Sequence, residues 1–446
     1  MSAMSQFFRR HLTVVVALML SLPLPGLGAA AESPLDQHLG VATCAGSTCH
    51  AATQPFPDHR IPQNEYFIWQ RKDSHAQAFN TLLSPRSQKI AAGLGWGDAA
   101  KAAGCLDCHA DNVPAGARGA RFQLSDGVGC EACHGGAARW MEPHVQGFKT
   151  TGEAAALGMT ATWEPQTRAV LCLSCHQGDA QRPMTHAIMA AGHPPLLFEL
   201  DTFTTLEPAH FTVNAAYTAR KGKPDAARNW LAGQAESANL LLGNLAALPE
   251  GGVFPELAYF DCNACHHSMF ADRASAARTA GQMPGTVPLA DDSLLMLSHW
   301  LAQGDPALAA RWNEGRERLY GAIAHGNRAQ LRSRALELRS LLRERIVPAT
   351  RATLDPAQIH WLMNEIISED IDRLSGDFSH AEQTAMALTV LFTDLQQRGS
   401  ADVTPRLQQA VDALYAAVKD RDRYAPAAYR AAVEQTRSAL RGPAEK

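Results

Sequence analysis

The ten cysteines constrain this 446-residue chain more than any other feature, because all ten fall in one local pattern. Four segments read C-x-x-C-H, and a fifth has four residues between its cysteines and also ends in histidine. These motifs run from Cys44 to His50, Cys105 to His109, Cys130 to His134, Cys172 to His176 and Cys262 to His266. C-x-x-C-H is the attachment signature of c-type haem. The pattern predicts five covalently attached haem c groups.

The motif combines three bonds to one cofactor. Two thiols add to the two vinyl groups at one porphyrin edge, and the adjoining histidine binds the iron as its proximal ligand. The predicted attachment residues are Cys44, Cys49, Cys105, Cys108, Cys130, Cys133, Cys172, Cys175, Cys262 and Cys265, and the predicted proximal ligands are His50, His109, His134, His176 and His266. In the first motif, we expect the two additional residues to bulge outward as a loop.

Disulfides and zinc are the alternative uses of these cysteines. An oxidising compartment would allow five disulfides, but disulfides do not explain why a histidine follows every second cysteine. Structural zinc sites combine two cysteine pairs, or one pair with two spaced histidines, in a tetrahedral set. Five separate motifs, each ending in one histidine, favour haem over both.

The N-terminus resembles a secretory signal. Arg9 and Arg10 precede an apolar run from Leu12 to Leu22, and Ala29 to Ala31 form a small-residue cleavage site. An uncleaved anchor is the alternative, but the run is shorter than the roughly 20 residues that span a bilayer. We expect a signal peptide at 1–31, export to the periplasm, and no membrane span after cleavage. A formal net charge of -4 gives no indication of nucleic-acid binding.

Cysteine distribution divides the rest of the chain. All motifs lie between Cys44 and His266, and no cysteine follows them. We therefore expect a pentahaem cytochrome domain at 32–272 and a helical domain at 273–446. Glycine, proline and histidine are frequent in the first, so regular structure should be sparse there, with haem replacing much of the side-chain core. The predicted fold class is mainly α, with little β structure.

The C-terminal part has apolar residues at helical spacing. The segments are Ser293 to Leu301, Pro306 to Ala324, Arg328 to Ile346, Asp355 to Asp372, His380 to Gln397 and Thr404 to Val418. They predict a bundle of about five or six helices. Its arginines, among them Arg316, Arg318, Arg332, Arg334 and Arg339, are expected on solvated faces. A docking face for a redox partner is the alternative, and oligomerisation through this part also stays open.

The sixth ligand of each iron separates an electron carrier from an enzyme. Two imidazoles generally give low-potential iron suited to electron transfer. Eight further histidines lie in the haem-bearing part: His38, His59, His75, His144, His186, His193, His210 and His267. The predicted distal ligands are His75, His144, His186, His193 and His210, where His186 and His193 are two helical turns apart and can reach two haems. Met184, Met189 and Met269 are alternatives, although methionine more often fills apolar gaps.

Four longer strings resemble the multihaem cytochromes of the cytochrome c-554 type. They are Trp69 to Ala78 around Ser74-His75, Gly127 to Gly135, Thr185 to Pro194 followed by Phe198-Glu199-Leu200, and Cys265-His266-His267. The resemblance spans roughly Val41 to Phe270. It implies closely packed, mostly bis-histidine haems in periplasmic electron transfer, and it supports His75, His144, His186 and His193 as distal ligands. The expanded first motif, the fifth haem and the helical tail depart from the family.

These observations predict a periplasmic relay of electrons through five haems to redox partner proteins, either quinol-linked or periplasmic carriers. The alternative is a multihaem oxidoreductase in which one open five-coordinate haem acts on a small inorganic nitrogen or sulfur compound. All five motifs end in histidine, whereas pentahaem nitrite reductases typically have one C-x-x-C-K motif. Hydroxylamine oxidoreductases usually have eight haems. A third reading is a structural subunit whose helical tail assembles a larger complex.

Overall fold

The computed structural model describes residues 36–56, 61–248, 256–262, 265–266 and 287–441. Within these ranges the chain is almost entirely helical, and its only β pairings are two isolated bridges, His38 with Arg118 and Phe260 with Leu289. The prediction of a mainly α fold is confirmed. The expected signal peptide, His59, His267 and Met269 lie outside the described residues. No described helix is both long and apolar enough to cross a membrane.

The N-terminal part consists of short helices around the first four motifs. The regular structure of this part, which was expected to be sparse, consists of helical pieces of three to nine residues. Its α-helices are α2 (Val41–Cys44), α3 (Glu65–Lys72), α4 (Ala78–Leu82), α5 (Pro85–Gly93), α6 (Ala103–His109), α7 (Cys130–His134), α8 (Met141–Gln146), α9 (Thr151–Ala156), α10 (Pro165–Leu173), α11 (His186–Ala190), α12 (Leu200–Leu206) and α13 (Ala215–Lys221). Single turns are η2 (Ser74–Gln77), η3 (Ala115–Ala117), η4 (Leu124–Asp126), η5 (Ala137–Arg139), η6 (Ser174–Gly178) and η7 (Leu257–Tyr259).

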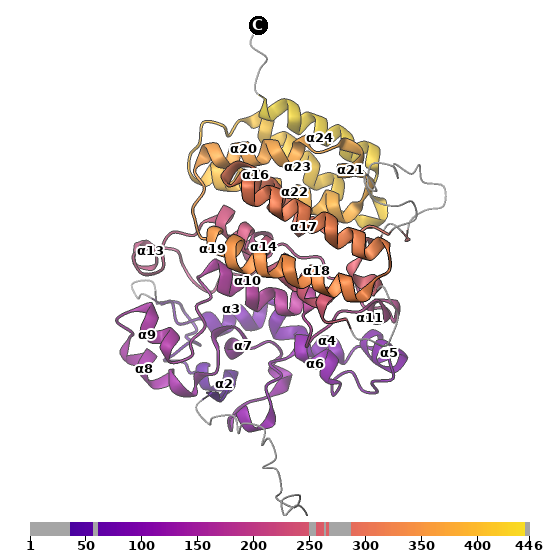
Figure 1. Ribbon diagram of the computed structural model, residues 1–446. Helices are drawn as coiled ribbons and strands as arrows, with labels where there is room; N and C mark the ends of the chain where they lie inside the picture. Colours follow the sequence, from indigo (N-terminus) through magenta and orange to yellow (C-terminus); the bar gives the residue numbers. More distant parts are fainter. Residues whose placement is uncertain (1–35, 57–60, 249–255, 263–264, 267–286, 442–446) are drawn as a thin grey trace, which may run out of the picture.

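Longer helices form the second part, which lies above the short helices in Figure 1. They are α14 (Ala226–Ala246), α16 (Asp292–Gly304), α17 (Pro306–Ala324), α18 (Arg328–Leu341) continued by η9 (Leu342–Ile346) and α19 (Val347–Ala349), α20 (Pro356–Ser368), α21 (Ile371–Gly376), α22 (Phe378–Gln397), α23 (Pro405–Val418), η10 (Arg421–Arg423) and α24 (Pro426–Leu440). The segment expected as one helix from Asp355 to Asp372 is two, since Glu369 and Asp370 are non-helical and Asp370 caps α21. Helices α14 and α24 were not predicted.

Helix α14 joins the two parts. It precedes the fifth motif in sequence, yet it packs on α16, α18 and α22 of the C-terminal part as well as on α10 and α12 of the N-terminal part. Trp230 and Leu231 of α14 are fully buried in one core cluster, and Leu242 lies in a second cluster. The predicted domain division at 272/273 stays a prediction.

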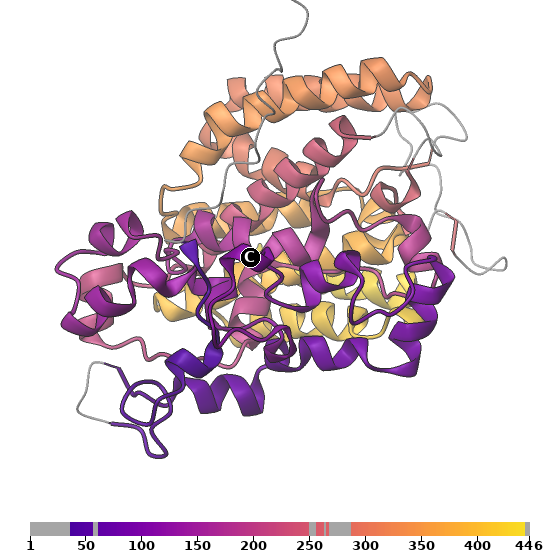
Figure 2. The ribbon, with the colours of Figure 1, turned by 90° about the horizontal axis from the view of Figure 1, so that it is seen from below.

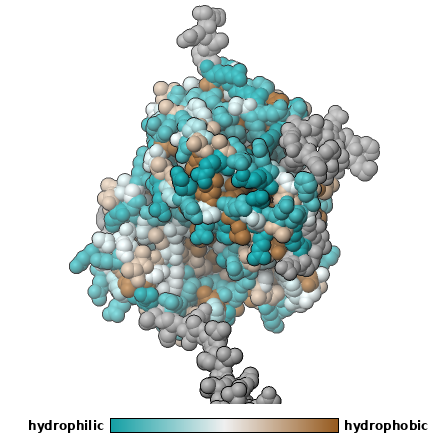
Figure 3. All heavy atoms as spheres, viewed as in Figure 1, coloured by the Kyte–Doolittle hydropathy of each residue, from teal (hydrophilic) through white to brown (hydrophobic). Residues whose placement is uncertain are grey.

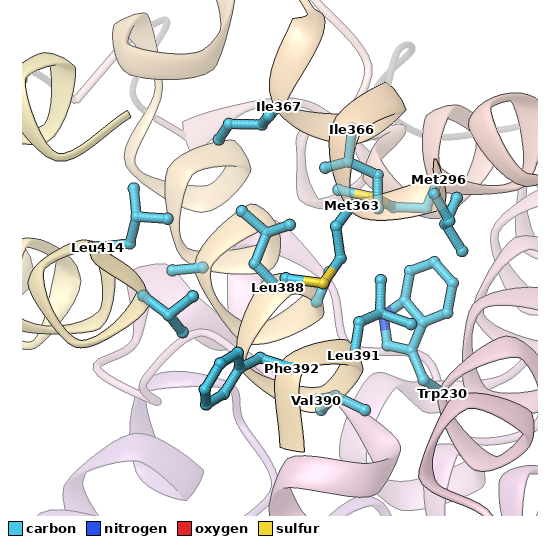
Figure 4. Close-up of a cluster of buried hydrophobic side chains, with 14 of the residues drawn as sticks. Trp230, Met296, Met363, Ile366, Ile367, Leu388, Val390, Leu391, Phe392 and Leu414 are labelled. Carbon is cyan, nitrogen blue, oxygen red and sulfur yellow. The ribbon is translucent and has the colours of Figure 1, made fainter. Parts of the chain in front are cut away.

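The core of the C-terminal part is made of large aliphatic and aromatic side chains. Figure 4 shows Met363 and Ile366 of α20 facing Leu388 and Leu391 of α22, with Trp230 of α14 beside them. On the face shown in Figure 3, hydrophilic atoms cover most of this part, and hydrophobic atoms gather in a recess near the centre. An aliphatic core of this kind stabilises the bundle by removing apolar surface from water.

One expected surface residue is buried. Arg316 was predicted to be solvated, and that prediction is wrong, because its side chain is almost fully enclosed and donates to Asp291 Oδ2 at 3.2 Å and Ser298 Oγ at 2.9 Å. Arg316 lies on the inner face of α17, where burial is tolerated because the charge is paired. Arg318, by contrast, is exposed and pairs with Glu314 one turn away.

Candidate haem-binding sites

Each attachment motif and its surroundings are called a site here, numbered 1 to 5 in chain order from Cys44 to His266. Sites 2 and 3 lie on the short helices α6 and α7, and site 4 runs from the end of α10 into η6. On a helix, residues three and four apart share a face. Two cysteines at i and i+3 and a histidine at i+4 therefore point to the same side, as attachment to one cofactor requires.

Site 1 reaches a similar arrangement despite its two additional residues. The backbone N–H of His50 donates to the carbonyl of Cys44 at 3.3 Å, just as the N–H of His266 donates to the carbonyl of Cys262 at 2.7 Å. Ser47 and Thr48 are exposed. The insertion therefore forms an outward turn, and the terminal histidine returns to the first cysteine.

Every motif histidine faces one of the five predicted distal histidines. The ring centres are 6.2 Å apart for His50 and His144, 6.3 Å for His109 and His193, 6.1 Å for His134 and His210, 5.9 Å for His75 and His176, and 6.2 Å for His186 and His266. A metal–imidazole bond is about 2 Å long. Two imidazoles on opposite sides of one metal ion therefore have ring centres about 6 Å apart, because each centre lies about 1 Å behind its nitrogen. The residues fit a bis-histidine haem at all five sites.

The distal histidines come from turns and helix ends. Asp73 caps the turn that begins the η2 segment, and His75 follows it. His186 begins α11, where Thr185 is the N-cap, and His193 follows the helix after Gly192, whose φ of 115° ends it. The two histidines of this one segment serve sites 5 and 2. His38, which was not among the predicted ligands, turns its Nδ1 to Asp111 at 2.7 Å instead.

Hydrogen bonds at Nδ1 orient several of these rings. His50 Nδ1 lies 3.0 Å from Glu65 Oε2, and His75 Nδ1 lies 2.9 Å from Asp73 Oδ1. In other rings a backbone carbonyl accepts instead: Ala78 for His109 at 3.1 Å, Pro194 for His193 at 2.7 Å, and Met141 for His144. Such bonds fix the tautomer and leave Nε2 available for a metal.

The pKa is lowered for some of the paired histidines and raised for others. Burial lowers the pKa of His134 to about 4 and that of His176 to about 4, so both rings are neutral at pH 7, as a metal ligand must be. The hydrogen bond that His50 donates to Glu65 raises the pKa of His50, and the bond that His75 donates to Asp73 raises the pKa of His75. At these two rings the carboxylate holds the Nδ1 proton and leaves Nε2 outside this bond.

The influence of one thiol on the pKa of another indicates which sites are neighbours. The thiol of Cys130 in site 3 raises the pKa of Cys44 in site 1, and the thiol of Cys175 in site 4 raises the pKa of Cys108 in site 2. Burial raises the pKa of Cys133 to about 12, and Cys172 of site 4 contributes to this shift. None of the ten cysteines forms a disulfide. These influences place site 1 near site 3, site 3 near site 4, and site 4 near site 2.

Glu131 lies inside the third motif, and the sequence analysis assigned no role to its carboxylate. Its buried carboxylate accepts hydrogen bonds from the N–H groups of Leu39, Gly40 and Ala137, each at 2.7 Å. It therefore ties the chain segment before site 1 to site 3. Asp73 and Glu65 were missed in the same way. The spacing Asp73-x-His75, which lets one carboxylate bond both the backbone N–H and the ring of the histidine, is the signal that could have found Asp73.

Two of the predicted alternative ligands lie near sites 4 and 5. Met184 and Met189 line a cavity of about 1040 Å³ that also borders Phe198, Cys262 and His299. Phe198 stacks on His176 with ring centres 4.5 Å apart. The cavity lies where sites 4 and 5 meet the helical part.

Comparison with known proteins gives one match. Residues 43–135, which contain the first three motifs, match the protein family described as cytochrome c554 and c-prime. No match to the chain was found among curated proteins or solved structures.

Proposed function

We propose that the chain is a periplasmic pentahaem relay with two histidine ligands at every iron. The match of residues 43–135 to the cytochrome c554 family supports covalently bound haem c, an electron-transfer role and redox partners. The observation that supports this most is the set of five imidazole pairs with ring centres 5.9 to 6.3 Å apart. Haem bound at each pair supplies an iron that alternates between its ferric and ferrous states.

The protein residues have three tasks in this proposal. The cysteine pairs would attach each haem, and the imidazole pairs would supply two ligands to each iron. Hydrogen bonds from the imidazoles to acceptors such as Asp73 and the Ala78 carbonyl hold the rings in place. With two histidines bound to each iron, a small substrate would have no vacant iron position to bind. The geometry therefore favours electron transfer over the alternative of an open catalytic haem.

The proximity of the sites to one another is the basis for a proposed spatial order. Thiols of sites 1 and 3, of sites 3 and 4, and of sites 2 and 4 influence each other's pKa, which places these sites near one another. The segment from His186 to His193 provides a histidine to site 5 and another to site 2. The proposed row is 1–3–4–2–5, which ends at Cys262 beside the cavity at the helical part. Redox partners are proposed to meet the protein near the two ends of this row.

The test replaces one distal histidine at a time in the haem-loaded protein. His75→Ala should convert one of five low-spin haems to high spin, because the imidazole facing His176 is lost. His38→Gln is the matched control, since His38 bonds Asp111 and faces no motif histidine, and it should leave all five haems low-spin. A His75→Ala spectrum identical to that of the parent protein would remove His75 from the ligand set.

A further inference from the structure

The five sites differ in what holds the Nδ1 proton of their histidines. At sites 1 and 4 the acceptor is a carboxylate, Glu65 or Asp73. At site 2 both rings bond backbone carbonyls, those of Ala78 and Pro194. At site 3, the described residues provide no hydrogen bond to the ring of His134 or of His210. A full negative charge therefore bonds a ligand ring at sites 1 and 4, whereas among the described residues site 2 has neutral acceptors and site 3 has none.

Both carboxylates are shielded from water. The Asp73 side chain is 7% exposed and that of Glu65 is 15% exposed. Asp73 also accepts from the backbone N–H of His75 at 2.9 Å, which fixes its orientation. Ligand atoms of Asp73, His75 and Glu207 lie within 4.8 Å of one another, so site 4 faces a second carboxylate. Because water screens a buried charge only weakly, the charges of Asp73 and Glu207 should act strongly on an iron bound by His75.

A carboxylate bonded to Nδ1 makes an imidazole a stronger electron donor, because the shared proton moves toward the acceptor. A stronger donor stabilises ferric iron over ferrous iron, and a nearby negative charge acts in the same direction. Second-shell hydrogen bonding is one of the means by which proteins set haem potentials.

We infer that Asp73 and Glu65 are tuning residues that hold sites 4 and 1 at lower reduction potentials than sites 2 and 3. This inference rests on the proposed bis-histidine ligation. Sites 1 and 4 are not neighbours in the proposed row, where site 3 separates them. Lower and higher potentials therefore alternate from site 1 through sites 3 and 4 to site 2, and an electron is not held at one end of the row.

The experiment is a potentiometric titration of the haem-loaded protein, with spin state recorded at every step. Asp73→Asn keeps the shape and the acceptor oxygen of the side chain but removes its charge. It should raise one of the five midpoint potentials so that the ratio of ferric to ferrous iron at a fixed potential falls at least tenfold, about 59 mV for one electron. Glu65→Gln should raise a different component by less, because Glu65 is more exposed. The double variant should show both shifts.

Asp126→Asn is the control, because Asp126 is half-buried in the same part and its pKa is raised by burial, with no histidine contributing to the shift. It should leave all five potentials unchanged. Five low-spin haems with unmoved potentials in Asp73→Asn would overturn the tuning role while leaving the ligation intact. A high-spin haem in Asp73→Asn would also overturn it, because Asp73 would then position His75 rather than tune it. A high-spin haem already present in the parent protein would contradict the proposed function itself.

Discussion

The haem-bearing part and the helical part bury their apolar side chains very differently. Among the described residues, the helical clusters contain large buried side chains such as Trp312, Phe392 and Tyr429. The buried cluster around Leu82 and Leu106 in the haem-bearing part is small by comparison. Exposed large apolar residues are concentrated in that part: Phe56, Ile61, Leu83, Trp96, Val145, Val170, Phe203, Leu206, Phe211, Val213 and Leu257, against Leu336 and Tyr415 elsewhere. Among the described residues, the first part therefore leaves more large apolar side chains for a cofactor to cover than the second part does.

The largest expected effect comes from withholding haem. In full-length chain produced without haem attachment, residues 36–222 should lose their amide protection against hydrogen exchange, because their core is missing. Helices α16 to α24 should keep protection, since their core is made of side chains alone. Hydrogen exchange followed by mass spectrometry measures both parts in one sample. Equal protection in both parts would contradict the comparison.

A smaller effect should follow from breaking the charge network of the helical part. Glu369 contacts His380 Nε2 at 3.2 Å, His299 Nε2 at 3.4 Å and Arg373 Nε at 2.7 Å. Glu369→Gln leaves buried positive charge unpaired, so the free energy of unfolding should fall by about 3–5 kcal/mol. Denaturant titration of the helical signal measures this change.

Glu337→Gln is the control for that prediction. Glu337 pairs with Arg334 on the surface, and exposed pairs contribute about 0–1 kcal/mol. The haem spectrum should be the same in both variants. A haem spectrum altered by Glu369→Gln would show that the two parts are not independent.

His380 should make the stability of the helical part depend on pH. Burial alone would lower the pKa of this histidine. Its hydrogen bonds to the carboxylates of Asp292 and Glu369 outweigh burial and raise the pKa to about 10. A raised pKa stabilises the folded state fully below about pH 6.5, and the contribution is lost as pH rises through about 10. His380→Gln should abolish this decline in urea midpoints measured between pH 7 and 10. His325→Gln, at an exposed position, should retain it, and retention of the full decline in His380→Gln would refute the assignment.

The smallest effect compares two aromatic residues of equal exposure. Phe211 is 44% exposed and Tyr415 is 43% exposed, but the Phe211 ring lies 5.9 Å from His210 at site 3. In the haem-loaded protein we expect porphyrin to cover Phe211, so Phe211→Ala should cost about 1–2 kcal/mol. Tyr415→Ala should change stability by less than about 0.5 kcal/mol. Equal costs would mean that exposed apolar residues of the first part do not face haem.

Sequence periodicity located most helices of the helical part because they are amphipathic, although α24 was not predicted. Pro306–Ala324 has its predicted ends, where Asp305 caps the first turn. Helix α14 was missed because it is buried on nearly every side, including polar residues such as Asn229, Gln234 and Glu236, so its sequence shows no clear apolar stripe. Arg316 was misplaced because its buried partners, Asp291 and Ser298, are distant in sequence.

The haem-bearing part was predictable in its chemistry more than in its geometry. Local spacing identified the motifs, because attachment requires residues that are close in sequence. Which distal histidine faces which motif depends on contacts across many residues, such as His134 with His210, and no local pattern encodes them. The proximity of Cys44 to Cys130 and of Cys108 to Cys175 could not be predicted from local sequence either.

Spin-state quantification of the haem-loaded, full-length protein by magnetic circular dichroism tests the central claim most directly. The five imidazole pairs predict five low-spin ferric haems per chain and no change on addition of nitrite or hydroxylamine. A high-spin haem that binds either compound would show an open iron position, and would contradict the account of a relay with two histidine ligands at every site.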